Sequence, residues 1–157
     1  MTEILKDEHL KILSQIFTDI PFNKMLGVKL EHISKDAIEM RFAMKPELVG
    51  NFVYGILHGG VISSVLDMAG GMNVMATAFH KHSDRPLNEL AAILTNCSTI
   101  DLHINYLRPG RGHHFIAKAF IQKSGKQISF TRMELWSDEN KLIATANGAY
   151  LLKSSYP

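Results

Sequence analysis

Hydrophobic positions along the chain follow two different periods, and these divide it into helical and extended segments. Residues 3–20 predict an amphipathic helix that ends at Pro21, with Thr2 as its N-cap. Its apolar residues recur at helical spacing: Leu10, Leu13, Phe17 and Ile20, with Ile16 beside them. Such a helix is expected to cover part of a core.

A period of two predicts strands in two further regions. Residues 27–44 predict a hairpin with one buried face and a turn at Lys35-Asp36. After residue 97 the alternation returns, beginning with Ile100, Leu102 and Ile104. Four strands separated by short polar turns are predicted there, at 100–106, 115–122, 127–136 and 142–152. Consecutive strands with short turns predict an antiparallel meander.

The segment 58–79 differs from both patterns because it is apolar on nearly every side. Between Val61 and Phe79 the one charged residue is Asp67. The length raises the question of a membrane span, but a central acid and several small polar or glycine positions argue against it. We therefore predict a helix buried in the middle of the protein. A short helix is predicted at Leu87–Leu94.

The order of elements is helix, hairpin, long buried helix and four strands. It predicts an α+β fold in which a curved antiparallel sheet wraps around one central helix. The absence of alternating strands and helices disfavours a doubly wound parallel sheet. We divide the chain into an N-terminal helix at 1–22 and a single domain at 23–157.

Composition narrows the class of protein further. With 157 residues, 46% of them hydrophobic, the chain is long enough for one domain with a real core. The net charge of +2 and the lack of basic runs give no reason to expect nucleic acid binding. A single cysteine excludes an intrachain disulfide and a cysteine-based zinc cluster. The charged start lacks the apolar core of a secretory signal, so a cytoplasmic location is expected.

Candidate chemistry lies in the buried helix. It opens with His58-Gly59-Gly60, and the first N–H groups of a helix lack partners and carry partial positive charge. Such an end can stabilise an oxyanion, although glycines before a helix often only form a turn. Asp67 either has a structural partner, such as an arginine or backbone N–H groups, or acts as a general base or nucleophile.

The spacing of Gly60 and Asp67 has a consequence for assembly. Seven residues are about two helical turns, so both lie on one face, roughly 10 Å apart along the axis. One helix spans this gap poorly for attack on a carbonyl bound at its start. An antiparallel second copy would bring its Asp67 near Gly60, which favours a two-fold dimer, although a bridging water is the alternative.

These residues carry a resemblance to a known family. The run from Ile56 to Gly70, ILHGGVISSVLDMAG, resembles the signature of hotdog-fold acyl-CoA thioesterases of the PaaI type, with the acid nine positions after the histidine. The run from Tyr106 to Gly112, YLRPGRG, resembles the loop that follows the family's third strand. The order of elements agrees over roughly 25–152, and the sequence is most similar to the YigI-like branch. The resemblance implies hydrolysis of medium- to long-chain acyl-CoA, in fatty acid metabolism.

The resemblance also implies roles for single residues. The Gly60 N–H would polarise the thioester carbonyl, and Asp67 of the other subunit would activate water or attack directly. His58 would shape the site, Asn51 would position water or substrate, and Thr99 would bind the attacking water. Gly59, Arg108 and Arg111 are assigned to the coenzyme A part of the substrate, since arginine suits phosphate contact. The family implies no separate cofactor, and it implies a homodimer that pairs again in some members to a homotetramer.

Two other functions fit the same pattern. A hydratase or dehydratase acting on acyl thioesters would share the fold but would pair its histidine and acid in another motif. A non-enzymatic acyl-CoA binding module would bind without releasing free thiol. Cys97 lacks a nucleophile signature and is expected to be a small core or interface residue. The pairs His80-Lys81-His82 and His113-His114 lack suitably spaced carboxylates, so no metal site is predicted.

Overall fold

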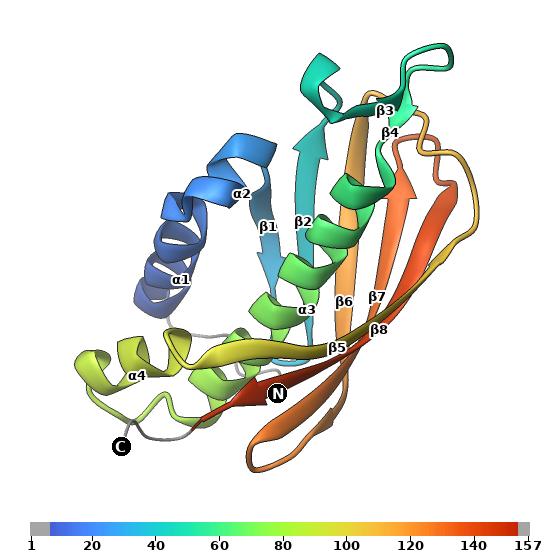
Figure 1. Cartoon of the computed structure of the whole chain (residues 1–157). Coiled ribbons are helices and arrows are strands. Elements are labelled where there is room, and N and C mark those ends of the chain that lie inside the picture. The colour runs from blue at the N-terminus through green and yellow to red at the C-terminus, as the bar shows by residue number, and fades with distance from the viewer. Residues whose placement is uncertain (1–6, 154–157) are drawn as a thin grey trace.

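In the computed structural model, which describes residues 7–153, a long helix lies across the concave face of a curved antiparallel sheet (Figure 1). The elements are α1 (Asp7–Asp19), α2 (Pro21–Leu26), β1 (Lys29–Ile33), β2 (Ala37–Ala43), the 3-10 turn η1 (Pro46–Leu48), β3 (Val49–Asn51), β4 (Ile56–Leu57), α3 (Gly59–Lys81), α4 (Leu87–Leu94), β5 (Cys97–Tyr106), β6 (His114–Ser124), β7 (Ile128–Ser137) and β8 (Leu142–Leu152). The predicted α+β class and the central helix are confirmed.

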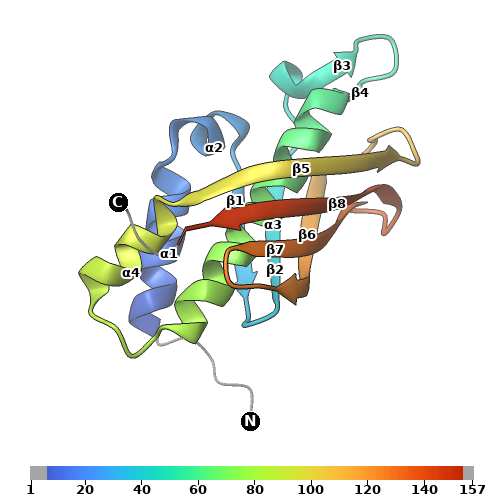
Figure 2. The same ribbon diagram turned by 60° about the horizontal axis from the view of Figure 1, so that its bottom comes forward.

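The sheet has the order β1-β2-β6-β7-β8-β5, with every pair antiparallel. The predicted meander is therefore right for β6, β7 and β8 but wrong for β5, which pairs with β8 and forms a sheet edge (Figure 2). The hairpin β1–β2 occupies the free edge of β6. The connection at 107–113 is long enough to pass the ends of two strands, which lie about 4.8 Å apart in a sheet.

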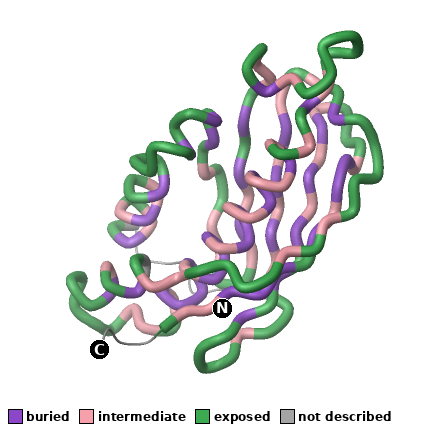
Figure 3. Tube along the Cα trace, viewed as in Figure 1, coloured by how far each residue is buried: buried purple, intermediate pink, exposed green. Residues whose placement is uncertain are grey.

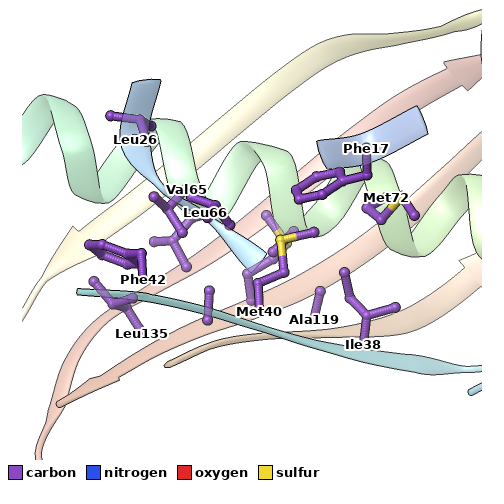
Figure 4. Packing of buried hydrophobic residues seen from close by; sticks show 14 of the residues in the cluster. Phe17, Leu26, Ile38, Met40, Phe42, Val65, Leu66, Met72, Ala119 and Leu135 are labelled. Atoms are coloured by element: carbon purple, nitrogen blue, oxygen red, sulfur yellow. The ribbon is translucent and has the colours of Figure 1, made fainter. Parts of the chain in front are cut away.

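The core lies between α3 and the sheet. Figure 4 shows Val65, Leu66 and Met72 of α3 packed against Ile38 and Met40 of β2. Leu66 and Met40 are fully buried. By length and composition α3 is able to cross a membrane, but most of its apolar stretch is buried inside this fold. It is the core helix that the sequence predicts.

One stripe of α3 is less buried than the prediction of an all-round apolar helix implies. Its positions recur every three or four residues and are half-buried or exposed: Gly60, Ser63, Ser64, Asp67, Met68, Gly71 and Met75. Figure 3 marks half-buried positions along this helix in pink. We call this stripe the open face of α3. The buried side of α3 packs on the sheet, and the strands β5 and β8 also reach the edge of the open face at Asp67 and Gly71.

The N-terminal region contains two helices where one was predicted. Pro21 ends α1, as expected, but its fixed φ also suits the first turn of a helix, and α2 begins there. The buried amide of Asn23 donates a hydrogen bond to the Phe17 carbonyl oxygen at 2.9 Å and joins the two helices. Leu13 and Phe17 enter the core. The predicted cap, Thr2, lies outside the described residues.

A small hairpin, β3–β4, was not predicted. It stands beyond the N-terminal end of α3 (Figure 1). Its tip carries Phe52, Val53 and Tyr54, and the Phe52 side chain is 92% exposed. We call these three residues the hairpin tip. The strands are too short for a period of two to stand out in the sequence.

Candidate active site

The N-terminus of α3 is held in place by neighbouring backbone. The His58 N–H donates to the Leu48 carbonyl oxygen at 2.8 Å, and the Leu57 N–H donates to the Gly110 carbonyl oxygen at 3.0 Å. A Cβ atom at Gly50 would lie 2.5 Å from the His58 Cα, so β3 approaches the helix start closely enough to require glycine. Gly50 is a supporting residue that the sequence analysis missed, since a glycine outside a motif gives no signal.

The first amides of α3 are not equivalent. The Gly60 N–H donates to His58 Nδ1 at 2.8 Å, and the Val61 N–H donates to the His58 carbonyl oxygen at 3.0 Å. The Gly59 N–H makes no hydrogen bond within residues 7–153. Gly59 therefore offers a free donor at the positive end of the helix, whereas the donor predicted at Gly60 is held by the imidazole.

His58 is the N-cap residue of α3, with extended backbone angles and an exposed side chain. Because its Nδ1 accepts a hydrogen bond, a neutral imidazole carries its proton on Nε2. The Nε2–H is then a second donor at the helix start. His58 thus both caps the helix and contributes to the polar surface that a bound carbonyl would meet.

Asp67 is half-buried and bound by two hydroxyl groups. Thr99 Oγ1 donates to Asp67 Oδ1 at 2.9 Å, and the Tyr150 hydroxyl lies 3.2 Å from the same oxygen and 3.2 Å from the Asp67 carbonyl oxygen. No arginine or lysine in the described part of the chain forms an ion pair with it. The structural alternative of an acid paired with a guanidinium is therefore absent from residues 7–153.

Thr99 thus lies at Asp67. The resemblance to the thioesterase family implied that Thr99 binds the attacking water. Tyr150 was not predicted, because it lies 83 positions after Asp67 and on another strand. Burial, and then the negative charge of Asp67, raise the pKa of the Tyr150 hydroxyl far above its usual range. Tyr150 is consequently a protonated donor at any physiological pH.

Cys97 lies close to the same acid but has little nucleophilic character. Its Sγ is 4.0 Å from the Gly71 carbonyl oxygen. Burial, reinforced by the charge of Asp67, raises the pKa of the Cys97 thiol to about 11. A thiol that stays protonated at neutral pH is a poor nucleophile, which agrees with its predicted place as a small packing residue.

Asn51 caps the hairpin turn. Its Oδ1 accepts hydrogen bonds from the N–H groups of Val53 at 3.1 Å and Tyr54 at 3.4 Å. This contact uses the acceptor oxygen of the side chain and leaves the amide NH₂ as the group that could meet a substrate.

The two predicted arginines lie on the loop at 107–113, beside the helix start. Arg108 donates to the Leu142 carbonyl oxygen at 2.9 Å, and the Arg111 guanidinium lies 5.8 Å from the centre of the Tyr54 ring. Both side chains are exposed, and neither is ion-paired with a carboxylate in the described residues. Asp138 anchors the loop by accepting a hydrogen bond from the His113 N–H at 3.0 Å, and this bond lowers the pKa of the Asp138 carboxyl.

An apolar pocket of about 250 Å³ adjoins the helix start. It lies between α2 and the first two turns of α3. Its lining comprises Phe22, Met25, Leu26, Glu47, Leu48, His58, Gly60, Val61 and Ser64. A mostly apolar cavity that ends at polarised N–H groups suits a ligand with an apolar tail and a carbonyl head. Within residues 7–153, no group of three or more histidine, cysteine or acidic side chains is placed to hold a metal ion.

Comparison with known proteins identifies the family of this chain. The model of the family described as "Thioesterase superfamily" matches residues 54–144. The Escherichia coli K12 protein "Medium/long-chain acyl-CoA thioesterase YigI" is 37% identical over 154 residues, which cover 97% of this chain and 99% of that protein.

Solved structures show the same fold. A Shewanella oneidensis protein related to the thioesterase superfamily has a TM-score of 0.88 at 37% identity, covering 93% of this chain and 96% of that one. The Escherichia coli PaaI protein has a TM-score of 0.76 at 16% identity, with 96% of each chain covered, which shows the shared fold alone. The chain therefore belongs to the thioesterase superfamily, as a thioester hydrolase with the hotdog fold.

Proposed function

We propose that this thioester hydrolase cleaves medium- to long-chain acyl-CoA at the N-terminus of α3. The observation that carries the proposal is the mostly apolar pocket that reaches the start of α3 at His58 and Gly60, next to the free N–H of Gly59. The YigI protein, 37% identical, is named for the same substrate class. The substrate carbonyl would lie at the amides, with its acyl chain in the pocket.

The reaction follows from the charges at the helix start. As a nucleophile adds to the carbonyl carbon, negative charge develops on the oxygen, and the Gly59 N–H stabilises it. Asp67 either takes a proton from the attacking water or attacks directly. With water as the nucleophile, the carbon–sulfur bond breaks to give the carboxylic acid, and the coenzyme A thiolate takes up the proton that Asp67 removed from the water. With direct attack, the same bond breaks to give a mixed anhydride on Asp67 and coenzyme A, and water then hydrolyses the anhydride to the carboxylic acid.

The coenzyme A part would extend along the loop at 107–113. Arg108 and Arg111 are exposed there, and this loop is bonded to Leu57 immediately before the helix start. Guanidinium groups bind phosphate through two parallel hydrogen bonds. The hairpin tip, with Tyr54 against Arg111, would border this region.

A homodimer completes the site in this proposal. The open face of α3 is only partly buried, and β5 is an edge strand with no neighbour on one side. Large apolar side chains on β5 and the hairpin tip are exposed, among them Ile100, Tyr106 and Phe52. An antiparallel partner helix on the open face would bring its Asp67 toward Gly59. The homotetramer stays a prediction, and so does the cytoplasmic location.

The test is release of free thiol from acyl-CoA substrates from acetyl to palmitoyl. We expect turnover that rises with chain length, and a loss of about 10²–10⁴-fold in the isosteric variant Asp67→Asn. Asp67→Asn keeps the shape of the side chain, so its melting temperature shows whether the fold is intact. Normal hydrolysis by a folded Asp67→Asn would refute the assigned role, and binding of acyl-CoA without thiol release would support a binding module instead.

The pocket has its own test. Met25 lines it from α2, and Met25→Trp would shorten the space for the acyl chain. We expect the ratio of kcat/KM for palmitoyl-CoA over butyryl-CoA to fall. Ile16→Trp, on the neighbouring helix α1 and outside the pocket, is the matched control. An unchanged ratio in Met25→Trp would place the acyl chain elsewhere.

A further inference from the structure

Tyr150 and Thr99 form a cross-strand pair that faces Asp67. They lie directly opposite each other on β8 and β5. A bulge follows at once, because the register of β5 shifts between Thr99 and Asp101. The two hydroxyl groups reach the same carboxylate oxygen, Oδ1, at 2.9 Å from Thr99 and 3.2 Å from Tyr150.

The phenol of Tyr150 occupies a slot between two glycines. A Cβ atom at Gly70 of α3 would lie 2.2 Å from the Tyr150 hydroxyl oxygen, and one at Gly148 of β8 would lie 2.8 Å from its ring. Tyr150 itself is 1% exposed. The helix and the strand therefore leave room for this ring in one position, which fixes the hydroxyl relative to Asp67.

The two oxygens of Asp67 consequently differ. Oδ1 accepts the hydroxyl proton of Thr99 and shares the single hydroxyl proton of Tyr150 with the Asp67 carbonyl oxygen, which is also 3.2 Å away. Oδ2 has no hydrogen bond to residues 7–153. Two donors to one oxygen hold the carboxylate plane in a single orientation and stabilise its charged form. Catalytic groups need such support, since small errors in placement cost much of the rate.

We propose that Tyr150 is a positioning residue for Asp67, which together with Thr99 fixes Oδ1 and leaves Oδ2 as the oxygen that activates water or attacks the thioester. This inference rests on the catalytic role proposed for Asp67. It gives Tyr150 a function beyond packing, because a phenylalanine would fill the same slot without reaching the carboxylate.

The experiment compares Tyr150→Phe, Thr99→Val and the double variant in the thiol-release assay. We expect kcat to fall about 10- to 100-fold in Tyr150→Phe, the effect of losing a hydrogen bond to a charged group, with KM nearly unchanged. The double variant should lose less than the product of the two single effects, since both donors act on one oxygen.

Thr145→Val is the matched control, because Thr145 lies five residues before Tyr150 on β8 and thus on the opposite face of the strand. It should leave kcat and KM unchanged.

Failure of the positioning role and failure of the proposed function give different results. If Asp67→Asn is inactive but Tyr150→Phe keeps the wild-type kcat, the positioning role is wrong and the proposed function stands. If a folded Asp67→Asn is active, the proposed function itself is wrong. A lower melting temperature of Tyr150→Phe without a fall in kcat would show that the phenol only packs.

Discussion

Gly59 and Gly60 differ in one hydrogen bond, and this bond decides which amide is free to receive a developing oxyanion. The Gly60 N–H is bound to His58 Nδ1, whereas the Gly59 N–H has no partner in the described residues. Two adjacent glycines that look equivalent in the sequence therefore have different chemistry. Substitution by proline tests this difference, because proline has no backbone N–H.

Gly59→Pro should reduce kcat about 10²–10³-fold, as loss of an oxyanion donor does. Proline is accepted at the first helical position, and the extended backbone of His58, with ψ of 135°, suits a residue before proline. Gly59→Ala is the control, since its Cβ would only touch the Tyr106 ring at 3.5 Å. Steady-state kinetics of both variants make the comparison, and a fully active Gly59→Pro would exclude this amide as the donor.

Cys97 is a reporter of the charge on Asp67. With a pKa of about 11, raised by burial and by that charge, its thiol should react slowly with iodoacetamide at pH 8 and faster as the pH approaches 11. In Asp67→Asn the negative charge is gone, so the thiol should ionise more readily and alkylate faster at pH 8. Mass spectrometry of timed reactions measures both rates. Equal rates in the two proteins would mean that the acid and the thiol do not interact.

At the scale of the element, the two faces of α3 have different roles. Its buried face fills the core, whereas its open face carries Gly60, Ser64 and Asp67. Gly70 and Gly71 lie next to each other where these faces meet. Only Gly70 lies against the Tyr150 hydroxyl, so we expect alanine to have opposite effects at the two positions.

Gly71→Ala should raise the melting temperature, because alanine favours a helix over glycine by about 1 kcal/mol and its Cβ would make an ordinary 3.5 Å contact with the Tyr150 ring. Gly70→Ala should lower it, since overpacking costs about 1–3 kcal/mol, and should also lower kcat by displacing the phenol. Thermal unfolding and steady-state kinetics of Gly70→Ala and Gly71→Ala test both expectations. Two equally stabilised variants would show that the slot is not tight.

At the scale of the whole molecule, the active site is formed either by one chain alone or by two chains together. α3 lies across the concave face of the sheet, of which β5 forms one edge (Figure 1), and Asp67 on the open face of α3 is bonded to Thr99 of β5. A partner placed there would cover both at once. Because the two-fold symmetry of a dimer repeats every contact, such a dimer would hold two equivalent sites.

Mixing two inactive variants tests this. Asp67→Asn retains its helix start, and Gly59→Pro retains its acid, so a mixed dimer would contain one intact site if each site draws on both chains. After joint unfolding and refolding at equal amounts, we expect about a quarter of wild-type activity, since half of the dimers are mixed and each has one of two sites. Each variant refolded alone is the control. No recovery despite proven exchange of subunits would place both groups of a site in one chain.

Individual residues of β5 show which features could be predicted from the sequence and which could not. The alternation through Leu102 and Ile104 predicted β5, and both residues pack against the core. The same alternation included Ile100, which lies at the bulge and is 53% exposed. A bulge inserts one residue and leaves no mark in a binary pattern, so the exposure of Ile100 was out of reach.

By itself the sequence determined α1, α3, α4 and the strands of the main sheet, their α+β class and the motif of His58, Gly60 and Asp67, because side-chain periodicity and the cost of a buried acid are local properties. It did not predict α2 or the short hairpin β3–β4. Tertiary structure alone decided the order of strands, with β5 at the edge, and the partners of the acid. Thr99 and Tyr150 come from strands far apart in the chain, and pairing between distant strands depends on how all their faces are buried together. The same packing requires glycine at positions 50 and 70. A side chain at Gly50 would clash with His58 and one at Gly70 with Tyr150, and these contacts exist only in the folded chain.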